Sequence, residues 1–295
     1  MDRNPKRLKA TRRILIAAFI LLCIWMLVGV AKAAKAGSAA TSNPQAFLPS
    51  LFYMLFNCKA MFWQGIWTTV RIALLGTLFA FILAVLLVFV RIQKPLRQDS
   101  NLTVLTKEIG CILSKVYITV IRGTPMMVQG MILYYAGFAI FRSSGMSVAE
   151  VNKVWSAFIA GLITVSLNST AYLTEVLRGG IEAVDPGQME AARSLGMTNW
   201  QTMIKVVFPQ AVKHSIPAIG NEFIINIKDS SVLSVIGCYD LMFATTSVVG
   251  IYYKALPVYC IAAVTYLILT CLSSLIMKFI SKKLDQDAVS VPSSN

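Results

Sequence analysis

Apolar segments long enough to cross a bilayer recur along the 295-residue chain, with shorter polar stretches between them. Backbone polar groups find no water partner in lipid, so segments that cross it are expected to be helical. The pattern therefore predicts an all-α polytopic membrane protein with one N-terminal span and five core spans. The expected spans are Ile14–Ala31, Ile66–Val90, Met126–Phe141, Val154–Leu177, Met203–Ile227 and Leu256–Ile280.

A polar, amphipathic stretch lies between the fourth and fifth expected spans. Asp185 is a suitable N-cap, Pro186 suits the first helical position, and Gln188 completes a capping box. Gly196 can end this short helix in a left-handed conformation, and a second capping box begins at Thr198. We expect a helix-turn-helix knob on which a soluble partner docks. The alternative is a helix that only lies on the membrane surface.

Composition and charge support a membrane protein. The chain is 57% hydrophobic with a mean hydropathy of +0.69, which excludes an ordinary soluble domain. The net charge of +14 would suit nucleic acid, but its distribution indicates a membrane instead. With the N-terminus inside, inner segments carry eighteen of the 27 Lys and Arg residues and outer segments carry seven. The positive-inside rule then predicts a cytoplasmic knob and C-terminus.

The N-terminal segment has two interpretations. A basic stretch precedes the first apolar run, as in a cleaved signal peptide or an uncleaved signal anchor. The run exceeds the usual 7–15 residues of a signal peptide, which favours the anchor. We expect this anchor and an outer linker over 1–60, a transmembrane domain over 61–283 with the knob at about 183–209, and a cytoplasmic tail over 284–295. Residues 91–115 are expected to form an unusually long loop.

Motifs in the knob and the spans resemble a known family. The knob is similar to the EAA loop of ABC-importer permeases, EAA-x3-G-x9-I-x-LP, with Val206 in place of Ile and Phe208 in place of Leu. Two further runs resemble signatures of polar amino acid permeases. The matching residues are Glu190-Ala191-Ala192, Gly196, Pro209, Arg122-Gly123-Thr124-Pro125, Val128-Gln129, Asn168-Ser169-Thr170-Ala171-Tyr172, Glu175, Arg178-Gly179-Gly180 and Gln188. The resemblance covers about residues 60 to 283.

The resemblance implies a bacterial inner-membrane permease with the ABC importer type I-like fold, five core transmembrane helices and one extra N-terminal helix. It implies alternating-access transport of a polar amino acid. The partners would be ABC ATPase subunits, a second permease chain in a homo- or heterodimer, and an extracytoplasmic binding protein. The knob residues expected to contact the ATPase are Glu190, Ala191, Ala192, Arg193, Leu195, Gly196 and Met197.

The sequence gives no sign of an enzyme. It contains no G-x-x-x-x-G-K-[ST] motif, so a separate ATPase subunit must hydrolyse any ATP. We expect no catalytic residue, no cofactor and no metal, because no Cys/His spacing resembles a zinc site. Cys58 and Cys238 are both expected on the outer side, where a disulfide between them is possible. The single histidine, His214, is expected to have a structural role.

Polar residues within the spans are candidates for the substrate pathway, because such groups are costly in lipid. Asn168, Tyr172 and Glu175 share one helical face, where Glu175 would favour a cationic amino acid if it faces a cavity. Alternatively, the first two join helices and Glu175 pairs with Arg178 near the interface. A second cluster, Lys228-Asp229-Ser230, fits a broken or re-entrant segment or a local ion pair.

Two rival classes remain at this stage. An ATP-independent carrier or channel would use the knob to bind a regulator, and such carriers often contain internal repeats with paired broken helices. The segment 154–200 has no convincing repeat elsewhere in the sequence, which counts against that reading. A membrane scaffold without transport would not need Asn, Tyr and Glu on one helical face.

Overall fold

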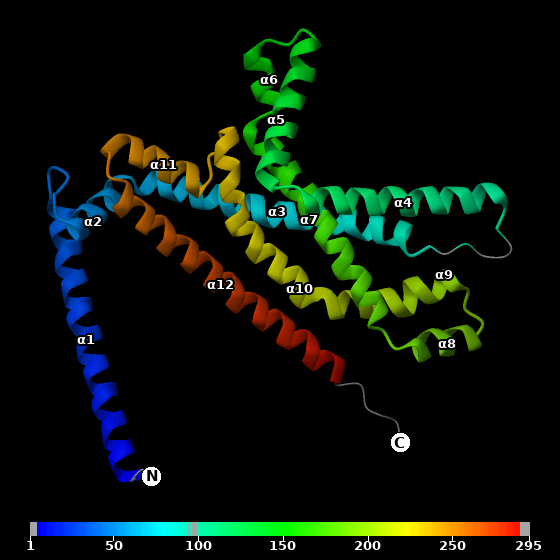
Figure 1. The fold of residues 1–295 in the computed structure, drawn as a ribbon, viewed down its shortest axis with the longest axis horizontal. Helices are drawn as coiled ribbons and strands as arrows, with labels where there is room; N and C mark the ends of the chain where they lie inside the picture. The colour runs from blue at the N-terminus through cyan, green and yellow to red at the C-terminus, as the bar shows by residue number, and fades with distance from the viewer. Residues whose placement is uncertain (1–4, 94, 96–98, 290–295) are drawn as a thin grey trace. The chain divides into compact units, whose positions relative to one another are not determined.

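The computed structural model of the chain describes residues 5–93, 95 and 99–289, and every regular element in them is helical (Figure 1). This confirms the all-α class. The elements are α1 (Pro5–Ala39), α2 (Phe47–Asn57), α3 (Lys59–Arg91), α4 (Asn101–Gly123), α5 (Met126–Ser143), α6 (Val148–Val154), α7 (Ala157–Glu182), α8 (Pro186–Ser194), α9 (Asn199–Thr202), the π-helix η1 (Met203–Val207), α10 (Phe208–Asp229), the 3-10 helix η2 (Ser230–Ile236), α11 (Leu241–Tyr252) and α12 (Ala255–Val289).

All six expected spans lie mostly within helices, and five of them also have the length and composition to cross a membrane. By length and composition, four helices in the described residues can cross a membrane, and the bent pair Asn199–Ile236 with Leu241–Tyr252 makes a fifth. The expected span 126–141 lies within helix α5. Gln129, Arg142 and two tyrosines lower the mean hydropathy of α5, and this helix is not among the candidate spans. Of the expected tail, 284–289 continue α12 and 290–295 lie outside the described residues.

The segment 91–115 is not the long loop that the sequence pattern predicted, because most of it belongs to α4. Ser100 caps this helix by accepting a hydrogen bond from the backbone N–H of Thr103 at 3.2 Å. Lys107 pairs with Asp99 at 2.7 Å and fixes the turn before the helix. Its leucines, isoleucines and valines recur at helical spacing from Leu102 to Val120, so the wrong prediction came from counting only long apolar runs as helices.

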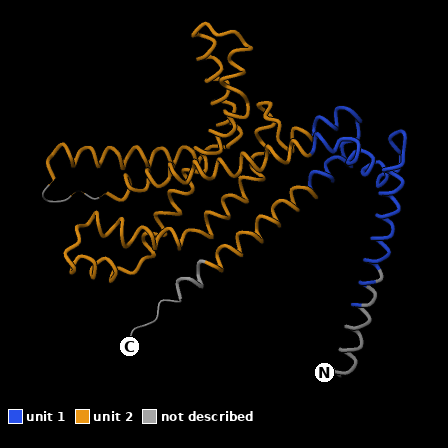
Figure 2. Tube along the Cα trace, turned by 180° about the vertical axis from the view of Figure 1, so that it is seen from behind, with its two compact units in different colours: residues 1–62, 245–263 blue, residues 63–244, 264–295 orange. Residues whose placement is uncertain are grey.

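The chain divides into two compact units (Figure 2). The first comprises residues 1–62 and 245–263. Inside it the rings of Tyr53 and Tyr252 meet edge to face with centroids 6.0 Å apart. Lys254 donates to the carbonyl oxygen of Pro44 at 2.6 Å. Cys58 belongs to this unit and Cys238 to the other, and both are free thiols.

The second unit, residues 63–244 and 264–295, is organised around α7. Ala80 and Ala84 of α3 form a buried cluster with Leu173 and Leu177 of α7. Small residues at this contact allow the helix backbones to approach closely. The same helix packs against α10, so α7 is fixed on two sides. It therefore provides a rigid support for the polar side chains along its length.

A buried chain of polar side chains joins three helices of this unit. Ser169 of α7 donates to the side-chain oxygen of Asn226 on α10 at 3.0 Å. The Asn226 amide nitrogen donates in turn to the hydroxyl of Thr77 on α3 at 2.9 Å. All three side chains are buried, and each hydroxyl or amide has a partner. The chain therefore fixes the register of α3, α7 and α10.

Candidate functional site

The knob begins at α8 with the predicted cap. The Asp185 carboxylate accepts a hydrogen bond from the backbone N–H of Gly187 at 2.8 Å, and Pro186 opens the helix. The capping box expected between Asp185 and Gln188 does not form. Gln188 donates its backbone N–H to the carbonyl oxygen of Asp185 at 3.0 Å. The helix therefore starts where the sequence predicts, with a simpler cap.

The turn of the knob closes as predicted. Gly196 has φ of +81°, the left-handed conformation that glycine adopts without a Cβ penalty. The backbone N–H of Met197 donates to the carbonyl of Ala192 at 3.2 Å, and that of Gly196 to Arg193 at 2.9 Å, which is the Schellman pattern. The second capping box is confirmed, because Thr198 exchanges hydrogen bonds with the residue three positions later. Two short helices thus meet at a fixed angle.

The outer surface of the knob combines charge with an apolar tip. Leu195 is 84% exposed, although it is a large apolar side chain. Glu190, Ala191 and Arg193 are also exposed, and neither charge has an ion-pair partner among the described residues. Ala192, in contrast, is only 5% exposed and packs within the chain. The exposed leucine and unpaired charges are available to another protein.

The base of the knob packs against the end of α3. The Trp200 ring of α9 meets the Phe89 ring of α3 with centroids 5.4 Å apart, and Phe89 also lies 4.9 Å from the ring of Phe208. Val184 and Val207 complete a small buried cluster beneath the knob. The knob is therefore in direct contact with α3 and with the start of α10.

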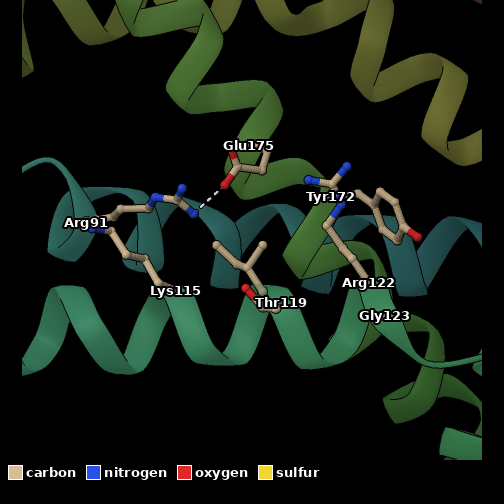
Figure 3. Close-up of a pocket in the computed structure, with 8 residues that line it drawn as sticks. Arg91, Lys115, Thr119, Arg122, Gly123, Tyr172 and Glu175 are labelled. Atoms are coloured by element: carbon tan, nitrogen blue, oxygen red, sulfur yellow. Dashed lines mark ion pairs between the residues drawn. The ribbon is translucent and has the colours of Figure 1, made fainter.

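A pocket of about 570 Å³ lies between the end of α3, α4 and α7 (Figure 3). This volume is within the usual range for small-molecule sites. The lining is dominated by charged and polar side chains, with three cations and a single carboxylate. The residues that line it are Arg91, Lys115, Ile118, Thr119, Arg122, Gly123, Tyr172 and Glu175.

Glu175 is engaged with arginines of its own chain. It forms an ion pair with Arg91 across the pocket, drawn as the dashed line in Figure 3. Its other oxygen accepts from Nε of Arg178 at 2.9 Å, and Arg178 also pairs with Glu182. The negative charge of Glu175 is therefore compensated within the protein. The expectation that this carboxylate favours a cationic amino acid stays a prediction.

The structure brings Tyr172 and Glu175 into the pocket but not Asn168. The side-chain amide of Asn168 donates to the Gln129 side chain at 3.0 Å and joins α7 to α5. The amide nitrogen of Gln129 reaches the carbonyl of Ile121 at 2.8 Å, where α4 ends. This pair of amides thus connects three helices. The sequence interpretation of Asn168 as helix-joining agrees with these contacts.

The second polar cluster lies away from this pocket. Lys228 and Asp229 are exposed at the end of α10, and no ion pair between them occurs in the described chain. Ser230 is buried and donates to the carbonyl of Ile227 at 3.0 Å. The α-helix changes here to the 3-10 helix η2, and the chain bends by 52° before α11. The broken-segment interpretation matches this geometry better than the local ion pair.

Several pocket residues were not singled out from the sequence. Arg91, Lys115 and Thr119 lie on α3 and α4, far from α7 in sequence, and only the fold brings them together. Arg122 was named only as part of a family signature, and its guanidinium lies over the Tyr172 ring, 5.1 Å from the centroid. Pro125 of the same signature is the N-cap of α5.

Comparison with known proteins identifies the family. Residues 107–288 match the binding-protein-dependent transport system inner membrane component family. A nopaline transport system permease protein of Agrobacterium fabrum is 32% identical over 207 residues, 69% of this chain and 79% of its own length. A glutamine transport system permease protein of Escherichia coli K12 is 34% identical over 171 residues, 58% of this chain and 72% of its own.

A solved structure shares the fold. The crystal structure of an amino acid ABC transporter with histidines superposes with a TM-score of 0.66 at 31% identity, over 81% of this chain and 99% of that one. These matches leave no basis for the ATP-independent carrier or the scaffold. The chain is a transport component of the inner membrane and not an enzyme. It belongs to the binding-protein-dependent transport system inner membrane component family, as a multi-pass permease subunit of an ABC importer.

Proposed function

We propose that this chain carries a polar amino acid across the bacterial inner membrane by alternating access. The observation that carries the proposal is the short physical link between the knob and the polar pocket. Phe89 contacts Trp200 of the knob, and Arg91, two residues later on α3, pairs with Glu175 in the pocket. The relatives named for glutamine and nopaline transport support an amino acid as the substrate.

The knob is the docking surface for a separate ATPase subunit. Leu195 inserts into a groove of the ATPase, and Glu190 and Arg193 pair with charges on it. Ala191 allows close backbone approach, while Ala192 and Met197 shape the helix from inside. Gly196 fixes the angle between the two short helices. Closure of the ATPase dimer then pushes on α9 and α3.

The pathway runs beside α7 and past the bend after α10. Tyr172 and Glu175 line the pocket, and Asn168 supports α7 from the α5 side. Lys228, Asp229 and Ser230 mark the change from α-helix to 3-10 helix, where backbone groups can line a cavity. A broken helix is tolerated at membrane depth only in such a position.

The assembly contains two copies of the permease domain, residues 61–283, as a homo- or heterodimer with two ATPases. An extracytoplasmic binding protein delivers the substrate. The charge asymmetry supports a cytoplasmic knob and C-terminus.

Reconstituted vesicles test the proposal. The tagged chain with its co-purifying ATPase is inserted into liposomes, with ATP on the ATPase side and radiolabelled glutamine and binding protein on the other. Glutamine, glutamate, histidine and arginine are compared. ATP-dependent accumulation of at least one of them is expected, and ATP-independent uptake or no uptake of any would contradict the proposal.

A further inference from the structure

The polar pocket, defined by its lining residues above, contains more positive than negative charge. Arg91, Lys115 and Arg122 contribute three cations, and Glu175 contributes the single carboxylate. Because Glu175 is held by Arg91 and by Arg178, it offers little free negative charge to a bound molecule. The uncompensated charge of the pocket therefore comes from α4.

Two cations of α4 carry this charge. Lys115 and Arg122 form no ion pair within the described part of the chain, and both side chains are exposed to the pocket. They are seven positions apart, which places them on the same face of the helix about two turns apart. Thr119 lies between them on that face and adds a hydroxyl that donates or accepts. Figure 3 shows all three along α4 below Glu175.

The Arg122 guanidinium has a fixed orientation. It lies over the ring of Tyr172, which restrains its plane without using its N–H donors. A planar guanidinium with free donors is suited to bind a carboxylate through two parallel hydrogen bonds. Lys115 adds a second positive charge at the other end of the same face, where it can meet a second acidic group.

We infer that this pocket binds its substrate through carboxylate groups and selects amino acids with neutral or acidic side chains over cationic ones. Arg122 binds the α-carboxylate, and Lys115 lies beside the side chain of the substrate. A lysine- or arginine-type side chain would bring a second positive charge next to Lys115 and be repelled. The inference rests on the proposed function and gives the substrate class.

Binding measured without the binding protein reports the selectivity of the permease pocket alone. The full-length chain with its co-purifying partners is placed in nanodiscs of phosphatidylcholine. Binding of radiolabelled L-glutamine, L-glutamate and L-arginine is measured without binding protein. Glutamine and glutamate are expected to bind at least about tenfold more tightly than arginine, a difference of about 1.4 kcal/mol. L-glutaminol, which lacks the carboxylate, should not compete.

Three variants test the residues. Lys115→Gln and Arg122→Gln should each weaken glutamate binding about tenfold or more. Lys115→Gln should also reduce the difference in affinity between glutamate and arginine. Lys153→Gln on α6 is the control, because it removes the same charge from an exposed lysine that lies outside the pocket and has no ion pair among the described residues. Its binding should be unchanged. If Arg122→Gln fails to fold, the effect of Lys115→Gln on glutamate binding still tests the inference.

Each other outcome overturns the inference. If arginine binds more tightly than the other amino acids and this preference is lost in Glu175→Gln, the Glu175 carboxylate recognises the substrate and the inference fails. ATP-dependent uptake into the reconstituted vesicles would still support the proposed function. A second outcome would assign the α4 cations to a lipid headgroup. In that case amino acid binding would be unchanged in the α4 variants, and native mass spectrometry would find phosphatidylglycerol bound to the native chain but not to Lys115→Gln. Absence of binding for all three amino acids, together with absence of ATP-dependent uptake for all four amino acids compared above, would refute the proposed function itself.

Discussion

Gly180 occupies a close contact between α7 and α10, the helices that enter and leave the knob. A Cβ built at this position would lie 2.7 Å from the backbone carbonyl oxygen of Ala211 and would also meet the Ser215 hydroxyl. The hydroxyl can rotate away, but the carbonyl belongs to the α10 backbone. Gly180→Ala therefore requires the two helices to separate by a few tenths of an ångström or more.

The neighbouring Gly179 provides the matched control. A Cβ at Gly179 would meet nothing within 4 Å, and both residues lie in the same turn of α7. Alanine in place of glycine gains about 0.5–1 kcal/mol of helix stability at either position. This gain cancels when the two variants are compared. The remaining difference in unfolding free energy measures the steric overlap between the new Cβ and α10. Overpacking costs about 1–3 kcal/mol, so Gly180→Ala should be less stable than Gly179→Ala by about that amount.

Thermal unfolding of the purified complex in detergent measures this difference. At roughly 2–4 °C per kcal/mol for a chain of comparable size, the midpoint of Gly180→Ala should lie about 2–12 °C below that of Gly179→Ala. ATP-dependent uptake should fall with it, because the separated helices transmit less of the knob's movement. Equal midpoints for the two variants would show that α7 and α10 do not pack through Gly180.

Three further substitutions test other contacts. Trp200→Ala removes the ring contact with Phe89, worth about 0.5–1.5 kcal/mol, and should reduce stimulation of ATP hydrolysis by the binding protein; unreduced phosphate release would argue against this link. Glu190→Lys should lower uptake while membrane insertion, measured by fractionation, stays intact, and normal uptake would exclude a coupling role. Asn226→Leu removes the buried hydrogen bonds to Ser169 and Thr77 and should lower the unfolding midpoint by the equivalent of about 1–3 kcal/mol, whereas exposed Asn221→Leu should not; equal midpoints would contradict the buried network.

The knob was predictable because its determinants are local. The Asp185 cap, the left-handed Gly196 and the box at Thr198 each depend on residues within a few positions of one another. Long apolar runs also predicted α3, α7 and α12, since a membrane imposes one length on its spans. In these elements the local preference and the final fold agree.

The pocket was not predictable, because it depends on contacts across α3, α4 and α7. Glu175 was a candidate from its place on a helical face, but its partner Arg91 lies 84 positions earlier in the chain. The helix that supplies Lys115 and Arg122 was taken for a loop up to Lys115, since its charged and polar face interrupts the kind of long apolar run that identified the other helices. Consequently the sequence pointed to the carboxylate of the pocket and missed the cations around it.

If the knob joins this permease to an ATPase, the two proteins should co-purify in mild detergent, and mass spectrometry of the tagged chain's partners measures this. We expect a P-loop ATPase at about one per permease chain, and its loss when Leu195→Asp places a charge at the apolar tip. A second permease sequence in the same sample would indicate a heterodimer. An intact, folded chain that retains no ATPase would contradict the docking role of the knob.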